Sequence, residues 1–194
     1  MNIQEIEDRR SIRKFKNLPV ETEKIEAILQ AALKAPSGKN KQPWKYVVLT
    51  GDRKNEMVDV MLRRICQIEK SFFGKKITGL ADAKHTAEIM KQAPVIIMVL
   101  DRCSKNIFQL HLPLDKMAST VNILSIGASI QNLLLEAQSL GLGTLWIGNT
   151  FFAYGPLRKW LNTTYSLVSA IAVGYPNQTP LPRLRKEFDE LVEW

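Results

Sequence analysis

The chain has little of several features that define large classes of proteins. Its two cysteines, Cys66 and Cys103, cannot form a disulfide scaffold, so a reducing compartment is expected. The longest purely apolar run, residues 95–100, is far shorter than the roughly 20 residues that cross a bilayer. The N-terminal residues lack the basic-then-apolar order of a signal peptide. These absences predict a cytoplasmic protein without a membrane partner.

The motifs of several common catalytic sites are also missing. His85 and His111 are far apart, and neither has a second ligand at the spacing of a metal site, so no metal is expected. A Gly-x-Ser-x-Gly nucleophile motif is absent, and neither cysteine lies in a recognisable activating motif. Residues 141–143 begin like a dinucleotide fingerprint, but Trp146 replaces its third glycine and the segment follows a predicted helix. No side chain therefore stands out as a catalytic acid, base or nucleophile.

Positive charge, in contrast, is abundant. The net charge is +8, and residues 1–76 hold 17 of the 27 lysines and arginines but only 10 of the 19 acidic residues. Such an excess favours an anionic partner, either nucleic acid or a small phosphorylated ligand. The basic residues are mixed with acidic ones and no nucleic-acid motif is present, so a small anion is favoured over nucleic acid. A generally solvated basic surface is the remaining alternative.

Hydrophobic periodicity predicts one α+β domain over residues 1–194. We expect helices over residues 2–10, 20–35, 55–68, 83–91, 115–140 and 156–161, and strands over residues 46–50, 94–100, 144–147 and 168–174. Apolar residues do not alternate in 94–100, which indicates a strand buried on both faces. The helix over 115–140 is apolar on most sides, so it belongs in the core or in a subunit interface, and Gly141 and Gly143 are expected to cap it.

Two kinds of segment could bind an anionic, planar ligand. Residues 9–13 contain Arg9, Arg10, Ser11 and Arg13, and residues 183–185 add Arg183 and Arg185. Guanidinium groups bind phosphate in a bidentate manner, which dispersed lysines do not. Residues 36–44, Pro-Ser-Gly-Lys-Asn-Lys-Gln-Pro-Trp, offer a hydroxyl, amides and a glycine backbone for the polar edge of a heterocycle. Each segment alone is more often a solvated surface or turn.

Taken together, the segments resemble the FMN-dependent nitroreductase family. Residues 9–15 are similar to its opening signature, residues 36–44 to its second motif, residues 130–148 to its third, and residues 173–186 to its closing phosphate-binding segment. Residues 62–92 match no motif, and we interpret them as a variable lid or insertion. The resemblance implies a mixed, mostly antiparallel central sheet between helix layers, as in a nitroreductase-like three-layer sandwich. It also implies an intertwined homodimer that binds FMN at its interface.

The resemblance assigns expected roles to the residues of these motifs. Arg9 and Arg13 would serve the phosphate and the pyrimidine edge of the flavin, and Arg183 with Arg185 would close on the phosphate. Residues 36–42 would reach the flavin from the partner subunit. Residues 145–148 would line the ring, with a backbone N–H of the 147–149 turn near the flavin N5. The expected cofactor-binding residues are Arg9, Arg10, Ser11, Arg13, Pro36, Ser37, Gly38, Asn40, Gln42, Leu145, Trp146, Ile147, Gly148, Arg183 and Arg185.

The function implied by the resemblance is NAD(P)H-dependent reduction of nitroaromatics, quinones or other electron-poor small molecules by a ping-pong mechanism. Alternatives within the same fold are another flavin reaction (enone reduction, dehalogenation or flavin breakdown) or a non-catalytic flavin store. Phe72, Phe73 and Phe108 could shape a shared pocket for donor and acceptor, although Phe108 is equally well explained as a core aromatic.

Overall fold

The computed structural model of the protein describes residues 3–71, 77–104 and 113–194. Phe72, Phe73, Phe108 and His111, named above, lie outside the described residues. The centre of the structure is a four-stranded sheet with the order β1-β2-β4-β3. Its strands are β1 (Trp44–Thr50), β2 (Val95–Asp101), β3 (Gly143–Ile147) and β4 (Ser166–Gly174). All neighbouring strands are antiparallel, and Ser11 adds a parallel bridge to Thr144 of β3, so the sheet is mixed but mostly antiparallel.

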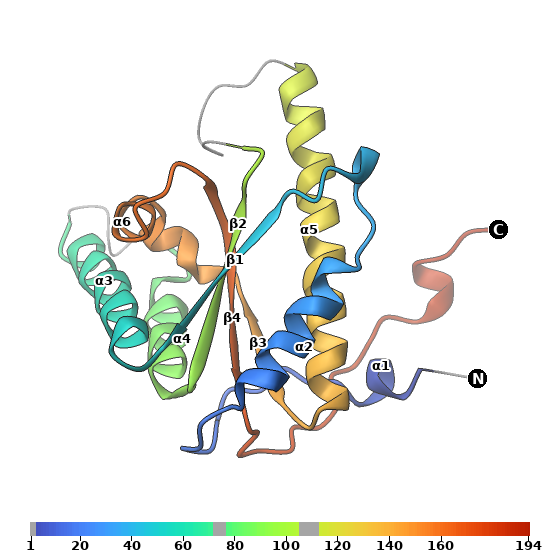
Figure 1. The fold of residues 1–194 in the computed structure, drawn as a ribbon, viewed down its shortest axis with the longest axis horizontal. Coiled ribbons are helices and arrows are strands. Elements are labelled where there is room, and N and C mark those ends of the chain that lie inside the picture. Colours follow the sequence, from blue (N-terminus) through green and yellow to red (C-terminus); the bar gives the residue numbers. More distant parts are fainter. Residues whose placement is uncertain (1–2, 72–76, 105–112) are drawn as a thin grey trace.

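Helices cover both faces of this sheet (Figure 1). One layer contains α3 (Gly51–Glu69), α4 (Leu80–Gln92) and α6 (Tyr154–Trp160), and the other contains α2 (Thr22–Leu33) and α5 (Pro113–Ser139). The short α1 (Gln4–Asp8) lies beside the C-terminal half of α5. The three-layer α+β architecture expected from the sequence is therefore confirmed.

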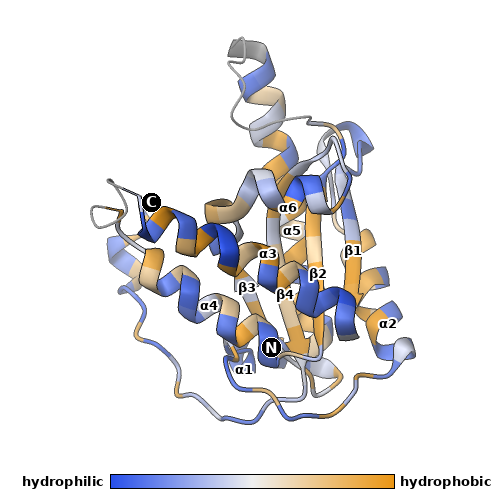
Figure 2. Ribbon diagram, turned by 90° about the vertical axis from the view of Figure 1, so that its left-hand side faces the viewer, coloured by the Kyte–Doolittle hydropathy of each residue, from blue (hydrophilic) through white to orange (hydrophobic). Residues whose placement is uncertain are grey.

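The pattern of β2 follows from its place between the two helix layers. Every residue of β2 is buried. Ile96, Met98 and Leu100 pack toward α3 and α4, whereas Val95, Ile97 and Val99 pack toward α2 and α5. A strand covered on both faces has no polar side, which is why its sequence does not alternate. In Figure 2 the strands are accordingly mostly orange, while the helices carry both orange and blue residues.

Much of the segment interpreted as a variable lid belongs to the packed core. Residues 62–69 continue α3, and residues 80–92 form α4, which starts three residues earlier than expected. Ile65, Leu80 and Ala83 are buried against the sheet. The C-terminal end of α4 is joined to α3 through Lys54. Nζ of this lysine donates hydrogen bonds to the carbonyls of Lys91 and Ala93 at 2.7 and 2.8 Å. The variable lid or insertion over residues 62–92 stays a prediction, with α4 and the end of α3 as its helical parts.

The end of α5 is capped by one of the two glycines named above. Gly141 has a φ of +72°, and its N–H donates to the carbonyl of Gln138 at 3.0 Å. The N–H of Leu142 donates to the carbonyl of Ala137 at 2.8 Å, which completes a Schellman motif. The prediction for Gly143 was wrong, because this residue is the first of β3 and not part of the cap.

By length and composition alone, α5 could also span a membrane, a test that core helices of soluble proteins pass as well. Its inward side packs in the core, with Ile126, Ile130 and Leu133 fully buried. Its N-terminal half is different, because Met117 and Leu124 are exposed there by 61% and 69%. The helix is therefore a core element at one end and an open apolar surface at the other.

Candidate functional site

The arginine-rich segment after α1 is held against the edge of the sheet. The N–H of Ile12 donates to the carbonyl of Thr144 in β3 at 2.9 Å. This close approach needs Gly143, because a Cβ there would lie 2.7 Å from Cγ1 of Ile12. Ile12 is buried, whereas Ser11 and Arg13 on either side of it are partly exposed. The glycine is thus required for docking the segment that carries Arg13.

The segment after β4 returns along the same part of the chain. The N–H of Lys16 donates to the carbonyl of Tyr175, and the N–H of Asn177 donates to the carbonyl of Lys14, both at 2.9 Å. Residues 180–185 and the arginine-rich segment then surround a cavity of about 380 Å³. Its lining residues are Ile6, Glu7, Arg9, Arg10, Ser11, Arg13, Pro180, Leu181, Pro182, Arg183 and Arg185. Six residues predicted from two distant segments are therefore brought together.

The cavity is electrostatically suited to an anion. Burial, followed by repulsion from Arg185 and then from Arg10, lowers the pKa of Arg9 below its ordinary value. Side-chain hydrogen bonds from Arg10 and Arg13 go to backbone carbonyls: those of Glu7 and Arg9 at 2.6 and 2.9 Å, and that of Ser11 at 3.3 Å. The acidic residue Glu7 also lines the cavity, so its lining contains five arginines and one carboxylate side chain. Such an excess of clustered guanidiniums fits the phosphate of FMN.

Strand β3 leads from this cavity along the edge of the sheet. Trp146 is 45% exposed, whereas the other four residues of β3 are buried. Its indole lies over Gly127 of α5, since a Cβ on that glycine would be 3.9 Å from Cη2 of the ring. Leu145 and Ile147 pack in the core between the sheet and α3, so only their backbone is available to a ligand. Of the four predicted ring-lining residues, Trp146 and Gly148 are therefore the open ones.

The other predicted group, loop 36–42, lies elsewhere on the same chain. Gly38 of this loop accepts no side chain, because a Cβ would lie 2.5 Å from Cγ1 of Val121. Its N–H donates to Oγ of Ser125 at 3.4 Å, which fastens the loop to the N-terminal half of α5. Lys39, Asn40 and Gln42 all have positive φ values of 52°, 52° and 47°, an unusual run for residues other than glycine.

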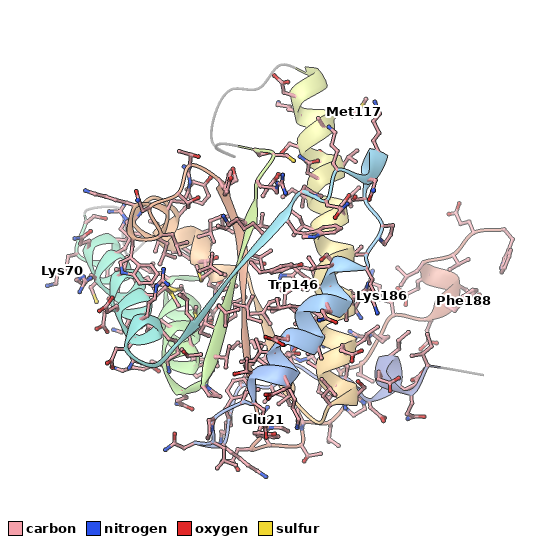
Figure 3. The ribbon with its side chains drawn as sticks, in the orientation of Figure 1. Glu21, Lys70, Met117, Trp146, Lys186 and Phe188 are labelled. Atoms are coloured by element: carbon pink, nitrogen blue, oxygen red, sulfur yellow. The ribbon has the colours of Figure 1, made fainter. Side chains whose placement is uncertain are left out.

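Loop 36–42 and the arginine cavity are consequently separated in one chain. The loop contacts α5 around Met117 and Val121. The helix α1, which borders the arginine cavity, lies near Leu135 and Ser139. These positions differ by roughly 20–35 Å along the helix axis at 1.5 Å per residue. Figure 3 shows Met117 near the end of α5 that is remote from α1. A single chain does not assemble all the predicted residues into one pocket.

This arrangement has counterparts among known proteins. The sequence model of the nitroreductase family matches residues 6–175. The chain belongs to the nitroreductase family. A relative in this family is the iodotyrosine deiodinase of Nematostella vectensis, which is 31% identical over 193 residues, covering 95% of this chain and 71% of that protein.

Two solved structures resemble this one over nearly the whole chain. A BluB-like flavoprotein of Clostridium difficile 630 is 26% identical, with a TM-score of 0.79 and coverage of 100% of this chain and 99% of that chain. A putative nitroreductase of Desulfovibrio desulfuricans, solved in complex with FMN, is 28% identical and has a TM-score of 0.73. The match covers 99% of this chain and 95% of that chain. The family resemblance inferred from the motifs is thus confirmed.

Sequence reasoning missed one polar contact of this nitroreductase-family site. Nδ2 of Asn149 donates to Oγ1 of Thr86 on α4 at 2.9 Å, and the Thr86 hydroxyl donates to the carbonyl of Asp82 at 2.7 Å. The turn that follows β3 is therefore tied to the opposite helix layer. Thr150, the next residue, is fully buried, and its hydroxyl has no hydrogen-bond partner among the described residues. No sequence signal joins residues 86 and 149, because only the fold brings them together.

Proposed function

We propose that this nitroreductase-family protein binds FMN and uses it to transfer hydride from NAD(P)H to small, electron-poor acceptors. The observation that carries the proposal is the cavity in which two distant segments of the chain bring five arginines together. Arg9 and Arg13 would serve the phosphate and the pyrimidine edge of the flavin, and Arg183 with Arg185 would close on the phosphate. Arg10 and Ser11 would lie beside them. The structure of the family member solved with FMN supports this choice of ligand.

Bound FMN supplies the redox chemistry, since a flavin can accept and release hydride. The protein then has to bind the cofactor, orient it and stabilise charge on it. A guanidinium that hydrogen-bonds to a charged group contributes about 1.5–3 kcal/mol. Trp146, with its exposed indole, and the backbone of residues 145–148 would border the ring. This division of labour agrees with a sequence that has no evident catalytic dyad.

The same proposal includes a homodimer in which loop 36–42 of a second copy completes the flavin site. The predicted residues of this loop lie too far from the arginine cavity of their own chain to contact a ligand there. They are Pro36, Ser37, Gly38, Asn40 and Gln42. The exposed apolar residues of α5 support an interface at this end of the helix. The C-terminal arm supports it as well, because it extends from the body with Leu184, Phe188 and Trp194 exposed (Figures 1 and 3).

A second candidate reaction is reductive dehalogenation of an aromatic compound. It is favoured by the 31% identity to an iodotyrosine deiodinase, a relative whose alignment covers almost all of this chain. The arginine cavity serves both reactions equally, since both would use the same flavin. The acceptor is therefore the property that separates the two candidates.

The test begins with the purified protein, reconstituted with FMN and freed of excess flavin. Retention of FMN in a one-to-one ratio, measured by absorbance, supports the flavin site, and failure to bind FMN overturns it. Oxidation of NADH and NADPH is then followed with a nitroaromatic, a quinone and an iodophenol as acceptors. Turnover with the nitroaromatic or the quinone supports the main proposal. Iodide release without nitroaromatic turnover supports dehalogenation instead.

A further inference from the structure

Tyr175 lies at the point where the two arginine-bearing segments are joined. Its carbonyl accepts the hydrogen bond from the N–H of Lys16, and Pro176 pairs with Phe15 in an antiparallel bridge. From this junction one segment leads to Arg13 and Arg9, and the other leads to Arg183 and Arg185. The position of Tyr175 therefore influences both walls of the arginine cavity.

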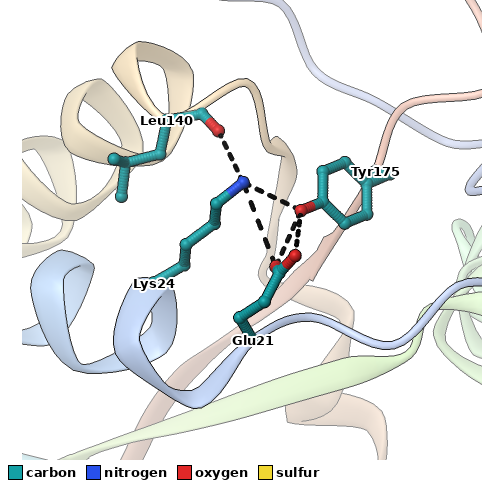
Figure 4. Close-up of polar contacts among 4 residues, drawn as sticks. All are labelled: Glu21, Lys24, Leu140 and Tyr175. Atoms are coloured by element: carbon teal, nitrogen blue, oxygen red, sulfur yellow. Dashed lines mark hydrogen bonds and ion pairs between the residues drawn. The ribbon is translucent and has the colours of Figure 1, made fainter.

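The side chain of Tyr175 is linked to two other parts of the fold (Figure 4). Its hydroxyl donates to the carboxylate of Glu21, 2.7 Å from Oε2 and 2.9 Å from Oε1. Nζ of Lys24 donates to the same hydroxyl at 2.8 Å and to the carbonyl of Leu140 at 3.4 Å, just after α5. The cluster of Glu21, Lys24 and Tyr175 thus connects the start of α2, the end of α5 and the end of β4.

The charges within this cluster support one another. The hydrogen bond from Tyr175 is the main cause that lowers the pKa of Glu21 below its ordinary value. The hydrogen bond to Tyr175 is the main cause that raises the pKa of Lys24. Both groups are therefore charged at neutral pH, and the phenol donates to one while it accepts from the other. Nζ of Lys24 also lies 4.9 Å from the centroid of the Tyr175 ring.

We propose that Glu21, Lys24 and Tyr175 are positioning residues for the phosphate end of the flavin site. By holding the junction of residues 14–16 with 175–177, the cluster keeps both arginine-bearing segments in the arrangement that surrounds the cavity. The proposal rests on the proposed binding of FMN, and it adds that phosphate recognition depends on residues that line no part of that cavity.

The size of the expected effect follows from a population argument. A ligand that binds one arrangement of a site has an apparent dissociation constant that rises in inverse proportion to the population of that arrangement. Loss of one net hydrogen bond lowers the equilibrium constant between the two arrangements about fivefold, so the population of the competent arrangement falls by at most about fivefold. A ligand without the phosphate makes fewer contacts with the arginines, so its affinity is expected to depend less on their arrangement.

The experiment compares FMN with riboflavin, which has the same ring but no phosphate. Dissociation constants of both flavins are measured by fluorescence titration for the wild-type protein, Tyr175→Phe and Glu21→Gln. Tyr175→Phe is expected to raise the dissociation constant of FMN by up to about fivefold and to change that of riboflavin less. Glu21→Gln keeps an acceptor oxygen for the phenol, so its effect is expected to be smaller.

Tyr165→Phe is the matched control. Tyr165 lies just before β4, and Nζ of Lys45 is 5.3 Å from the centroid of its ring, as Nζ of Lys24 is close to the ring of Tyr175. An equal weakening of both flavins by Tyr175→Phe would mean a merely structural role and would overturn the proposal. Unchanged FMN binding in both cluster variants would overturn it as well. Should Tyr175→Phe fail to fold, Glu21→Gln and Lys24→Met supply the same comparison. A wild-type protein that binds neither flavin refutes the proposed function instead.

Discussion

Gly38 and Val121 approach so closely that a methyl group on Gly38 would lie 2.5 Å from Cγ1 of Val121. The contact holds loop 36–42 on the exposed N-terminal half of α5. Three of the next four residues, Lys39, Asn40 and Gln42, have positive φ although none of them is glycine. Backbone strain of this kind persists only where its surroundings impose it. The loop is therefore a shaped element whose form depends on the surface of α5.

We expect Gly38→Ala to displace loop 36–42, because the β-branched side chain of Val121 has little rotational freedom to move aside. The cost is about 1–3 kcal/mol in unfolding free energy, as for other overpacked sites, together with weaker binding of FMN. Urea denaturation and fluorescence titration measure the two effects. Val121→Ala in the same chain should restore both. Gly155→Ala is the control. Gly155 lies in α6, and a Cβ added there would meet no atom within 4 Å.

Arg185→Ala is expected to weaken FMN binding by about 1.5–3 kcal/mol, the range of a hydrogen bond to a charged group. The unliganded protein should not lose stability, because Arg185 contributes to the repulsion that lowers the pKa of Arg9. Lys186→Ala is the control, because it removes one positive charge from the next residue. Lys186 is exposed, and its Nζ lies 4.0 Å from Oε2 of Glu190. Equal losses of FMN affinity in the two variants would contradict a specific role for Arg185.

The fold and the arginine-bearing segments were predictable because their signals are local. The apolar run of β2, the periodicity of α2 and the guanidiniums of residues 9–13 are each visible within a few consecutive residues. The resemblance to the family then joined the segments in the right order. What the sequence predicted well is therefore what a short window of chain determines by itself.

The remainder depends on contacts between distant parts of the chain. Gly143 was expected to cap α5, but it is the approach of Ile12 that requires a glycine there. The bond between Asn149 and Thr86 joins α4 to the turn after β3, and neither residue belongs to a motif. Leu145 lies in the core because β3 presents alternate residues to opposite faces of the sheet. Such relationships become visible only when the layers are assembled.

Lys54→Met should lower the free energy of unfolding by about 1–3 kcal/mol, because the buried carbonyls at the end of α4 would lose their donor. Nζ of Lys54 supplies those bonds to Lys91 and Ala93 at 2.7 and 2.8 Å. Chemical denaturation measures the change. Lys84→Met, which removes a solvent-exposed lysine 3.8 Å from Glu69, should stay within about 0.5 kcal/mol. If Lys54→Met left the free energy of unfolding unchanged, the two carbonyls would not need Lys54 as their donor.

The stabilisation by Glu21 is expected to depend on pH. Its pKa is lowered in the folded state, so the contribution is present above the ordinary glutamate value of about 4.3. It is lost as the pH falls through the lower folded value. The difference in melting temperature between the wild-type protein and Glu21→Gln should therefore shrink as the pH falls from 7 to 3. Glu23→Gln on the same helix is the control, and a difference that grows toward acid would contradict the assigned sign.

Donor and acceptor are expected to use one site in turn, which predicts ping-pong kinetics. Residues 1–194 contain no dinucleotide-binding motif, so NAD(P)H and the oxidant are expected to reach the same flavin. Double-reciprocal plots at several fixed acceptor concentrations should give parallel lines. A high concentration of acceptor should inhibit competitively with NAD(P)H, because both would occupy the space beside Trp146. Intersecting lines, or a complex that holds donor and acceptor analogues together, would show that two sites are present.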